Sequence, residues 1–487
     1  MPTIVDRQTE QRELRALLSR GTPQLALLYG RRRIGKTYLL NHIWPREQVF
    51  YFTGAETTEA QNRATLVQDL ADWSGDALHV EDYPTWRQVF RLLFEVRSPE
   101  PLVIVLDEFQ YLGKTPEDLG SIASELNAVW EQQRPNRPFV LILSGSAVKT
   151  LEALDKGGAP LYGRFTWKAK LEPFDYGHVA EMAPFASLRD RVRCYAAFGG
   201  TPRYLAALDL EQSLDENISR LLLDPRGEVR SLVETALVQE RGLREVAKYQ
   251  AILRAIGTGN TAFAEIKIRA GLQADADTVV RRMVGKLIDL GYVRSERNVG
   301  AKATAAYRYR IDDPAFAFYC AFVTRFEAAL ARNDAMSIWT QQVARLFDGY
   351  IGHVFERIAE QAYRRLQARL DLPLVGDWGR WEGQDRERQS LEIDMVAPLV
   401  DGRVMTGGVK WNSTPISTKW HHHHMEGLQR LTKSGVPWAH AAVKRESPLL
   451  WVAAGGFEPE FAAAIRAERS EVYLWDLNTL YGAEAIP

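Results

Sequence analysis

A phosphate-binding loop is indicated near the N-terminus by Gly30–Thr37, which reads G-R-R-R-I-G-K-T. The apolar run Leu25–Tyr29 precedes it, and a run with the pattern of a helix follows it. A glycine, four residues, then Gly-Lys-Thr between a strand and a helix is the pattern of a P-loop. Glycines let backbone N–H groups surround a phosphate, and the helix start directs further N–H groups at the same anion. The alternative is a glycine-bounded basic turn, but the complete motif favours nucleotide binding.

The pattern gives each position a chemical role. The backbone around Gly30, Arg33 and Gly35 would surround the phosphates. Lys36 would reach the β- and γ-phosphates, and the Thr37 hydroxyl would take a place on Mg²⁺. We therefore expect ATP and Mg²⁺ as cofactors.

A second motif ends the apolar, β-branched run Leu102–Leu106, which is followed by Asp107 and Glu108. So apolar a run predicts a strand buried on both faces of a parallel sheet, and such sheets bind ligands at the C-terminal ends of their strands. Asp107 would bind Mg²⁺ through water, and Glu108 would polarise the attacking water. Two acids at a strand end usually mark only a solvated turn, but the P-loop upstream favours the catalytic interpretation.

Three further side chains are candidates for the same site. Ser144 ends the apolar run Phe139–Leu143 and could hold the γ-phosphate or the lytic water, although serine also commonly opens a turn. Arg164 follows a glycine and could stabilise γ-phosphate charge, in cis or from a neighbouring subunit; an ordinary surface arginine is the alternative. Arg7 precedes an amphipathic helix that could brace the adenine, or that only packs on the sheet edge.

Length and composition limit the class of protein. A chain of 487 residues is too long for one core and predicts about three domains. Its net charge of −1 excludes a globally basic nucleic-acid binder but allows a local basic patch. Its two cysteines predict no disulfide framework, and no apolar run approaches the ~20 residues of a membrane span. We expect a cytoplasmic protein with no membrane partner.

The motifs in combination resemble a known family. After Asp107-Glu108 and Ser144 come Tyr162-Gly163-Arg164 and then the helix break Gly199-Gly200-Thr201-Pro202-Arg203. This order is similar to that of archaeal-type P-loop ATPases, which are AAA+/STAND-related proteins of archaea and bacteria. The resemblance implies an AAA+-like parallel sheet with a helical lid. It also implies that Arg164 is the arginine finger and that Arg203 is a sensor in the lid.

A DNA-binding module is predicted in the middle of the chain. Three helical runs and a hairpin, between residues 249 and 310, follow the order of a winged helix. From Val246 to Arg310 the chain has twelve Lys/Arg and five Asp/Glu, a net of 12 − 5 = +7. Off the apolar stripe of the third helix lie basic side chains free to meet the phosphates of double-stranded DNA, namely Arg281, Arg282 and Lys286. A winged helix used only for packing or dimerisation is the alternative.

In the last third, Glu356 lies on a predicted helix, Asp394 on one strand and Lys410 on the next. This order resembles a PD-(D/E)XK restriction-endonuclease-like domain, which also occurs at the C-terminus of this ATPase family. The resemblance implies Mg²⁺ between Asp394 and an acid two residues before Lys410, with Glu356 in the outer shell. That position is Gly408, so one metal ligand is missing. Glu392 could replace it only if its side chain swings to the site.

The run His421–His424 suggests metal binding at first sight. Consecutive imidazoles point in different directions, so four in a row rarely form one site. We expect a polar loop here.

The fold class that we expect is α/β, with five successive parts. These are a P-loop ATPase core (residues 1–180), a helical lid (181–245), a winged helix (246–312), a helical connector (313–345) and a nuclease-like domain (346–487). The expected function is an ATP-hydrolysing molecular switch that engages DNA, for which the resemblance suggests prokaryotic defence or genome maintenance. One alternative is an ATP-gated, metal-dependent DNA nuclease. Another is a DNA-binding regulator or scaffold without meaningful turnover, and a homo-oligomer or a protein partner is open in each case.

Overall fold

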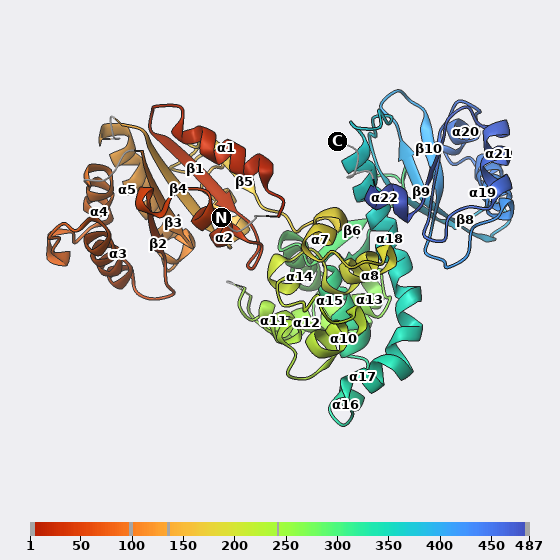
Figure 1. The fold of residues 1–487 in the computed structure, drawn as a ribbon, viewed down its shortest axis with the longest axis horizontal. Coiled ribbons are helices and arrows are strands. Elements are labelled where there is room, and N and C mark those ends of the chain that lie inside the picture. Colours follow the sequence, from red (N-terminus) through yellow and green to blue (C-terminus); the bar gives the residue numbers. More distant parts are fainter. Residues whose placement is uncertain (1–4, 97–100, 134–136, 241–242, 483–487) are drawn as a thin grey trace. The chain divides into compact units, whose positions relative to one another are not determined.

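The computed structural model describes residues 5–96, 101–133, 137–240 and 243–482. The chain forms two compact units, one of residues 1–173 with 201–203 and one of residues 174–200 with 204–487. Figure 1 shows the fold of each unit.

The first unit is built on a parallel sheet in the order β2-β3-β4-β1-β5 (Figure 1). Strand β4 separates β1, which leads into the P-loop, from β3, which ends at Asp107. The strands are β1 (Gln24–Tyr29), β2 (Val49–Thr53), β3 (Leu102–Asp107), β4 (Phe139–Gly145) and β5 (Trp167–Lys170).

Helices cover both faces of this sheet, because successive strand residues point to opposite sides. On one face α1 and α2 pack on Ala26, Val103 and Ile142. On the other, α3, α4 and α5 pack on Leu27 and Leu106. The helices are α1 (Gln8–Leu18), α2 (Lys36–His42), α3 (Glu59–Ser74), α4 (Trp86–Glu95), α5 (Pro116–Gln133) and α6 (Val148–Ala153). The predicted parallel-sheet P-loop fold is confirmed.

The second unit begins with a helical region. Helix α8 ends at the Gly199-Gly200 break, where a Cβ on Gly200 would lie 1.9 Å from the carbonyl oxygen of Phe174. Only glycine allows this approach. The helices are α7 (Tyr176–Met182), α8 (Leu188–Phe198), α9 (Pro202–Leu205), α10 (Leu214–Ile218) and α11 (Glu228–Ala236), with a π-helical turn at Ser219–Leu223 after α10.

Next come three helices and an antiparallel pair of strands, the element order expected for a winged helix. The buried stripe of the third helix consists of Val280, Met283, Val284 and Leu287, whereas Val279 is only partly buried. The elements are α12 (Val246–Gly257), α13 (Phe263–Arg269), α14 (Asp277–Asp289), β6 (Val293–Glu296) and β7 (Arg308–Ile311). We refer to residues 297–307, between β6 and β7, as the wing.

An aromatic cluster joins the next helices to the long helix α18. Phe318 and Phe322 meet Phe347 and Tyr350 at ring-centroid distances of 5.3–6.4 Å. The three phenylalanines are buried and belong to the core. The helices are α15 (Pro314–Phe318), α16 (Glu327–Leu330), α17 (Ala335–Ile338) and α18 (Ala344–Leu366), with π-helical turns at Tyr319–Val323 and Trp339–Val343.

The chain closes with a mixed sheet in the order β12-β11-β10-β9-β8. The β8, β9 and β10 strands are antiparallel, and β10, β11 and β12 are parallel. We refer to α18 and this sheet with its helices as the C-terminal domain. Its strands are β8 (Gly379–Gln384), β9 (Ser390–Pro398), β10 (Val404–Lys410), β11 (Leu449–Ala453) and β12 (Val472–Trp475), and its later helices are α19 (Thr418–Lys433), α20 (Ala439–Ala442), α21 (Pro459–Glu468) and α22 (Leu477–Gly482).

The prediction of a polar loop at the four histidines is wrong, because they lie in α19. Two of them, three residues apart, face the core, where each has a polar partner. His421 Nε2 lies 2.8 Å from Glu468 Oε2, and His424 Nε2 lies 3.0 Å from Thr406 Oγ1. His422 and His423 are exposed. The run therefore belongs to an amphipathic helix, in which two of the histidines are buried in the core and two lie on the surface.

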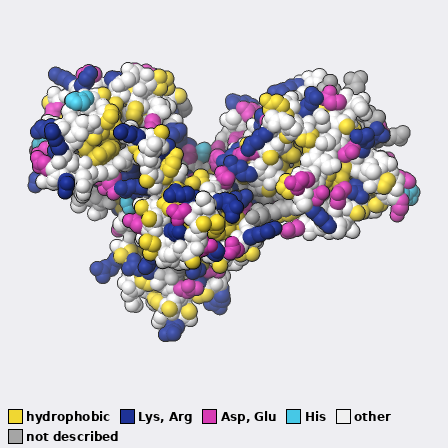
Figure 2. Space-filling view, turned by 180° about the vertical axis from the view of Figure 1, so that it is seen from behind, with side chains coloured by type: hydrophobic (Ala, Val, Ile, Leu, Met, Phe, Trp, Pro, Cys, Tyr) yellow, Lys and Arg dark blue, Asp and Glu magenta, His cyan; other side chains and the backbone are white. Residues whose placement is uncertain are grey.

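The surface carries charges of both signs. On the face drawn in Figure 2, Lys and Arg side chains lie among Asp and Glu side chains. Within the described residues, we find no helix that is both long and apolar enough to cross a membrane.

Candidate functional site

The P-loop turns sharply between β1 and α2. Arg33 (φ 68°) and Gly35 (φ 94°) both have left-handed backbone conformations. Such a conformation turns successive N–H groups toward one point, where an anion can bind. Gly30 lies where a Cβ would stand 2.6 Å from the Leu171 carbonyl oxygen, so a larger residue does not fit. The motif therefore forms the loop that its sequence predicts.

Lys36 and Thr37 start α2 beside the end of β3. The Lys36 side chain is buried, and its Nζ donates to the carbonyl oxygens of Gly30 (2.8 Å) and Arg31 (3.0 Å). Thr37 Oγ1 donates to Asp107 Oδ2 at 2.8 Å. These contacts bring together side chains from two motifs that are seventy residues apart in the chain.

Tyr51 on β2 also contacts this carboxylate. Its hydroxyl donates to Asp107 Oδ2 at 2.6 Å. Burial, together with the nearby Asp107 carboxylate, raises the pKa of Tyr51 far above its usual value. The phenol therefore stays a neutral donor. The sequence offered no signal for Tyr51, since one tyrosine in an apolar strand has no motif.

The donor set at this point fits Mg²⁺. A hydroxyl and a carboxylate, Thr37 and Asp107, lie in contact beside the phosphate-binding loop, and Asp107 is only 2% exposed. Magnesium is commonly held by one or two such protein oxygens, with phosphate oxygens and water completing its shell. Among the described residues no group of three or more His, Cys, Asp and Glu side chains could hold a metal. A metal at this point would need the nucleotide's own oxygens.

Glu108 is held in a defined position just after β3. Its backbone is left-handed (φ 50°), and its Oε2 accepts hydrogen bonds from Ser146 Oγ (2.8 Å) and the Ser146 N–H (3.3 Å). Gln110 Nε2 donates to the same oxygen. A Cβ at Gly145 would stand 2.1 Å from Gln110 Oε1, so glycine makes room for this amide.

Ser144, the serine predicted for the site, lies two residues earlier. It is fully buried in β4, beside Leu28 of β1, and its Oγ has no hydrogen-bond partner in the described part of the chain. The structure brings Ser146 to Glu108 instead. Both serines lie in the Ser-Gly-Ser run at residues 144–146. The sequence alone does not show which of them reaches Glu108, because that depends on the register of β4.

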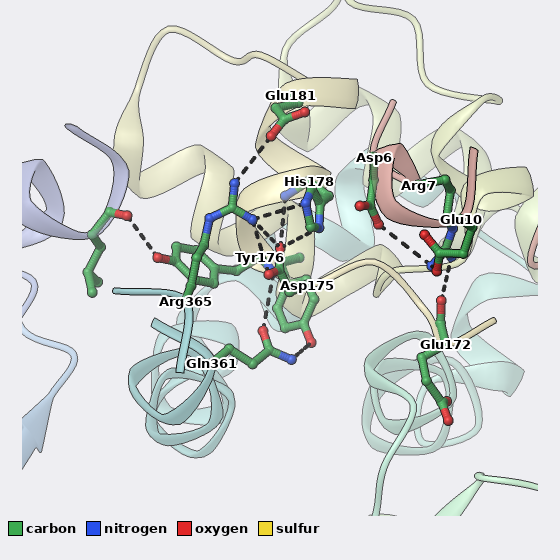
Figure 3. Close-up of polar contacts among 12 residues, drawn as sticks. Asp6, Arg7, Glu10, Glu172, Asp175, Tyr176, His178, Glu181, Gln361 and Arg365 are labelled. Carbon is green, nitrogen blue, oxygen red and sulfur yellow. Dashed lines mark hydrogen bonds and ion pairs between the residues drawn. The ribbon is translucent and has the colours of Figure 1, made fainter. Parts of the chain in front are cut away.

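Arg7 is buried just before α1. Figure 3 shows its side chain among Asp6, Glu10 and Glu172. Its guanidinium donates to the Glu172 carbonyl oxygen at 2.5 Å and lies 3.6 Å from Asp6 and 3.8 Å from Glu10. Both Asp6 and Arg7 have left-handed backbones. Arg7 therefore fixes the entry of the chain into α1, and its contact with adenine stays a prediction.

The two arginines implied by the family resemblance have different surroundings. Arg203 ends the segment Thr201–Arg203, which belongs to the unit of the P-loop, and the Pro202 ring lies 3.9 Å from the Cβ position of Gly35. Arg164 instead contacts α5, through Asn127 (3.2 Å) and Glu131 (3.2 Å). Both catalytic roles remain predictions.

In the C-terminal domain the predicted nuclease residues lie around a cavity of about 610 Å³, but they do not form a metal site. Lys410 Nζ pairs with Asp394 Oδ2 at 2.6 Å. A Cβ at Gly408 would stand 2.4 Å from the Trp451 ring, so that ring fills the place of the missing acid. The packing of β10 beside β11 therefore requires glycine at position 408, where the nuclease pattern has an acid.

The other carboxylates of this region are held by Arg380. Its guanidinium lies 3.5 Å from Glu356 and pairs with Glu392. Glu392 therefore does not swing to Asp394 here. A Mg²⁺ site of the nuclease type does not fit these residues.

Of the predicted DNA-contact residues, Arg281 and Arg282 are exposed on α14, and Lys286 is half-buried. The Arg281 guanidinium lies 3.9 Å above the Phe263 ring. A stacked guanidinium keeps its N–H groups available at the ring edge.

Comparison with known families agrees with this geometry. Residues 4–208 match a family described as an ATPase domain predominantly from Archaea. Residues 319–423 match a family of archaeal and bacterial proteins of unknown function. Residues 4–208 are therefore an archaeal-type P-loop ATPase domain, joined in the same chain to a region of the second family.

Individual relatives extend over most of the chain. An uncharacterized protein of Methanocaldococcus jannaschii is 26% identical over 420 residues, which is 84% of this chain and 87% of that protein. A Walker-type ATPase of Pyrococcus abyssi is 20% identical, with a TM-score of 0.45 over 65% of this chain and 96% of its own. The ORC2 protein of Aeropyrum pernix, solved with ADPNP and ADP, is 15% identical, with a TM-score of 0.43 over 68% and 96%. The fold assignment rests on strand order and on the family match.

Proposed function

We propose that this protein is an ATP-hydrolysing molecular switch that engages double-stranded DNA. The observation that carries the ATPase part is the 2.8 Å contact between Thr37 of the P-loop and Asp107 at the end of β3, with Glu108 fixed beside it. This is the arrangement that phosphoryl transfer to water needs, since catalysis consists mainly of positioning and charge stabilisation.

Each side chain has a separate task. Lys36 would leave its loop carbonyls to neutralise the β- and γ-phosphates, and Thr37 and Asp107 would supply the protein oxygens for Mg²⁺. Glu108 orients the attacking water. Arg203 senses the γ-phosphate, and Arg164 acts as an arginine finger, for which its half-exposed position suits a neighbouring subunit.

The switch follows from chain connectivity. The segment Thr201–Arg203 belongs to the ATPase unit, whereas the remainder of α9 belongs to the second unit. Contact between a γ-phosphate and Arg203 would bias this segment, and hydrolysis would release it. The nucleotide state would then reach the helical region directly along the chain.

The DNA part of the proposal rests on charge. The region from Val246 to Arg310 has a net charge of 12 − 5 = +7 in a chain of net charge −1. Arg281 and Arg282 are exposed on the third helix of this region. Basic side chains on such a helix are suited to duplex phosphates. A role in prokaryotic defence or genome maintenance agrees with this arrangement.

Nucleotide binding and hydrolysis by the purified chain test the ATPase part. Lys36→Ala should lose ATP binding, whereas Glu108→Gln should keep it and slow hydrolysis at least a hundredfold. Glu117→Gln, in the first turn of α5, is the matched control. Very slow hydrolysis by the wild-type chain that Glu108→Gln leaves unchanged would instead favour a DNA-binding regulator that uses ATP only as a ligand.

A further inference from the structure

The wing is held by the C-terminal domain. The side-chain amide of Asn298 pairs with the backbone of Glu382, donating to its carbonyl oxygen at 2.7 Å and accepting from its N–H at 3.1 Å. The Val299 N–H donates to the Arg380 carbonyl oxygen at 3.2 Å. Both partners lie in β8, the edge strand of the C-terminal sheet. The wing therefore covers an edge that would otherwise be open to pairing.

The wing also enters the core of that domain. Val299 is only 4% exposed and belongs to the apolar cluster formed by Ile393, Leu428 and Trp438. The Trp438 indole N–H donates to the Val299 carbonyl oxygen at 3.1 Å. Burial of the Val299 side chain away from water stabilises the docked wing.

Carboxylates meet the arginines of the strands beside the wing. Arg308 on β7 pairs with Glu382 of the C-terminal domain. Arg310 pairs with Glu296 at 3.0 Å, and Arg294 with the same glutamate at 2.6 Å. On DNA these guanidinium groups would meet phosphate oxygens, which present the same charge and acceptor geometry as a carboxylate.

The ion pair to the C-terminal domain is accessible to solvent. The Arg308 and Glu382 side chains are 40% and 36% exposed, and cavities of about 420 and 620 Å³ border this region. Ion pairs this exposed contribute little stability and weaken with salt. A polyanion can therefore compete for Arg308 without first unfolding either module.

We propose that the C-terminal domain is a built-in competitor of DNA for the wing, with Glu382 standing where a phosphate would bind Arg308. Duplex DNA engages the wing only when Asn298, Val299 and Arg308 leave β8. This proposal rests on the proposed DNA engagement and assigns a regulatory task to a nuclease-like domain that lacks a metal site.

The test combines duplex affinity with hydrogen exchange of the full-length chain. Both Glu382→Gln and Asn298→Ala should weaken docking. The first keeps the side-chain volume and removes the charge, and the second removes a half-buried amide with its two hydrogen bonds to Glu382. Each should tighten binding of a fluorescent duplex about fivefold or more at low salt. Glu387→Gln, which removes an exposed charge from the β8–β9 turn, should leave the affinity unchanged. Hydrogen exchange over residues 297–307 should become faster in both docking variants, and saturating duplex should lower protection of the Val299 amide in the wild-type chain.

The outcomes separate the two proposals. If the wild-type chain does not bind duplex but the docking variants do, the C-terminal domain blocks the wing strongly, and the inference holds. If duplex binds with equal affinity to all variants, and the Val299 amide keeps its protection, the inference is overturned while DNA engagement stands. If neither the wild-type chain nor a variant with a demonstrably released wing binds duplex, both proposals fail.

Discussion

Glu108 is fixed by two side chains from outside the P-loop, Ser146 and Gln110. Ser146 and Gln110 hold the carboxylate oxygen that would face the attacking water. A hydrogen bond to a charged group contributes about 1.5–3 kcal/mol, which corresponds to at least a tenfold effect on a step that depends on it. The orientation of Glu108 should therefore depend on Ser146.

We predict that Ser146→Ala slows ATP hydrolysis about tenfold and leaves ATP affinity within about twofold of wild type, since the hydroxyl orients Glu108 without reaching the P-loop. Single-turnover hydrolysis with radiolabelled ATP and a separate binding titration measure the two quantities. Ser144→Ala is the matched control and should change the rate less than about twofold. A larger loss of hydrolysis rate in Ser144→Ala than in Ser146→Ala would contradict this prediction and support Ser144 as the catalytic serine that the sequence pattern suggests.

The sequence predicts some residues of the site and not others for a physical reason. Lys36 and Thr37 belong to one contiguous turn, and Asp107 and Glu108 to one strand end, so local patterns identify them. Ser146 meets Glu108 across 38 residues of chain. Such a contact depends on the register of β4 beside β3, which no single-sequence pattern specifies.

Burial also determines the pH dependence at one residue. Burial of His424, with smaller contributions from His421 and Arg469, lowers the pKa of its imidazole to about 3. In the unfolded chain this imidazole titrates near ~6.5. The unfolded chain therefore binds one more proton between these values, and stability falls as the pH drops from about 6.5 toward 3.

We expect the C-terminal domain to lose about 2 kcal/mol of unfolding free energy from His424 between pH 7 and pH 5. Urea unfolding of the full-length chain at both pH values measures this loss. His424→Gln should show a smaller loss, and the exposed His423→Gln should behave as wild type. His421, whose pKa burial also lowers, keeps part of the effect in every variant. Equal pH dependence in wild type and His424→Gln would contradict the assignment.

At the scale of elements, the pairing of β10 with β11 explains why the predicted nuclease residues, among those that the structure describes, form no metal site. Gly408 lies in register with Trp451, whose ring occupies the space a side chain would need. Replacing Gly408 by an acid would therefore not restore the site by itself, because the Trp451 ring already fills the space that the acid's side chain would need. Restoring the acid alone should strain the sheet.

We predict that Gly408→Asp lowers the melting temperature and gives no Mg²⁺-dependent nicking of supercoiled DNA. Overpacking typically costs about 1–3 kcal/mol, to which the burial of a carboxylate adds. Differential scanning fluorimetry and a plasmid-nicking assay measure the two effects. Val400→Asp, at an exposed position between β9 and β10, is the control for added charge. A stable Gly408→Asp variant that nicks DNA with Mg²⁺ would show that the nuclease site is intact apart from one residue.

Element type was predictable where periodicity is strong and less so where context decides. The buried runs Leu102–Asp107 and Phe139–Gly145 form strands as predicted, because they are apolar on both faces. The histidine run suggests a polar loop, because consecutive imidazoles point in different directions and rarely form one site. It forms part of α19 because tertiary partners, Thr406 and Glu468, satisfy the two buried imidazoles.

At the scale of the whole molecule, the segment Thr201–Arg203 of the ATPase unit continues along the chain into the second unit, which contains the region proposed to bind DNA. We propose that ATP hydrolysis by the first unit and DNA binding by the second are energetically coupled. Coupling is reciprocal for binding, so a nucleotide that changes DNA affinity must itself bind differently in the presence of DNA. The wing, the C-terminal domain and the P-loop then belong to one switch.

The most direct test is the rate of ATP hydrolysis by the full-length chain with and without duplex DNA. We predict a Glu108-dependent rate that duplex changes at least threefold, with the change lost in the Arg281→Glu, Arg282→Glu double variant but the basal rate kept. Single-stranded DNA at equal phosphate concentration is the control for nonspecific charge. The contrary result is a Glu108-dependent rate that duplex leaves unchanged in both the wild type and the docking variant Glu382→Gln. It would contradict the proposed coupling of ATP hydrolysis to DNA binding and would indicate a partner other than DNA.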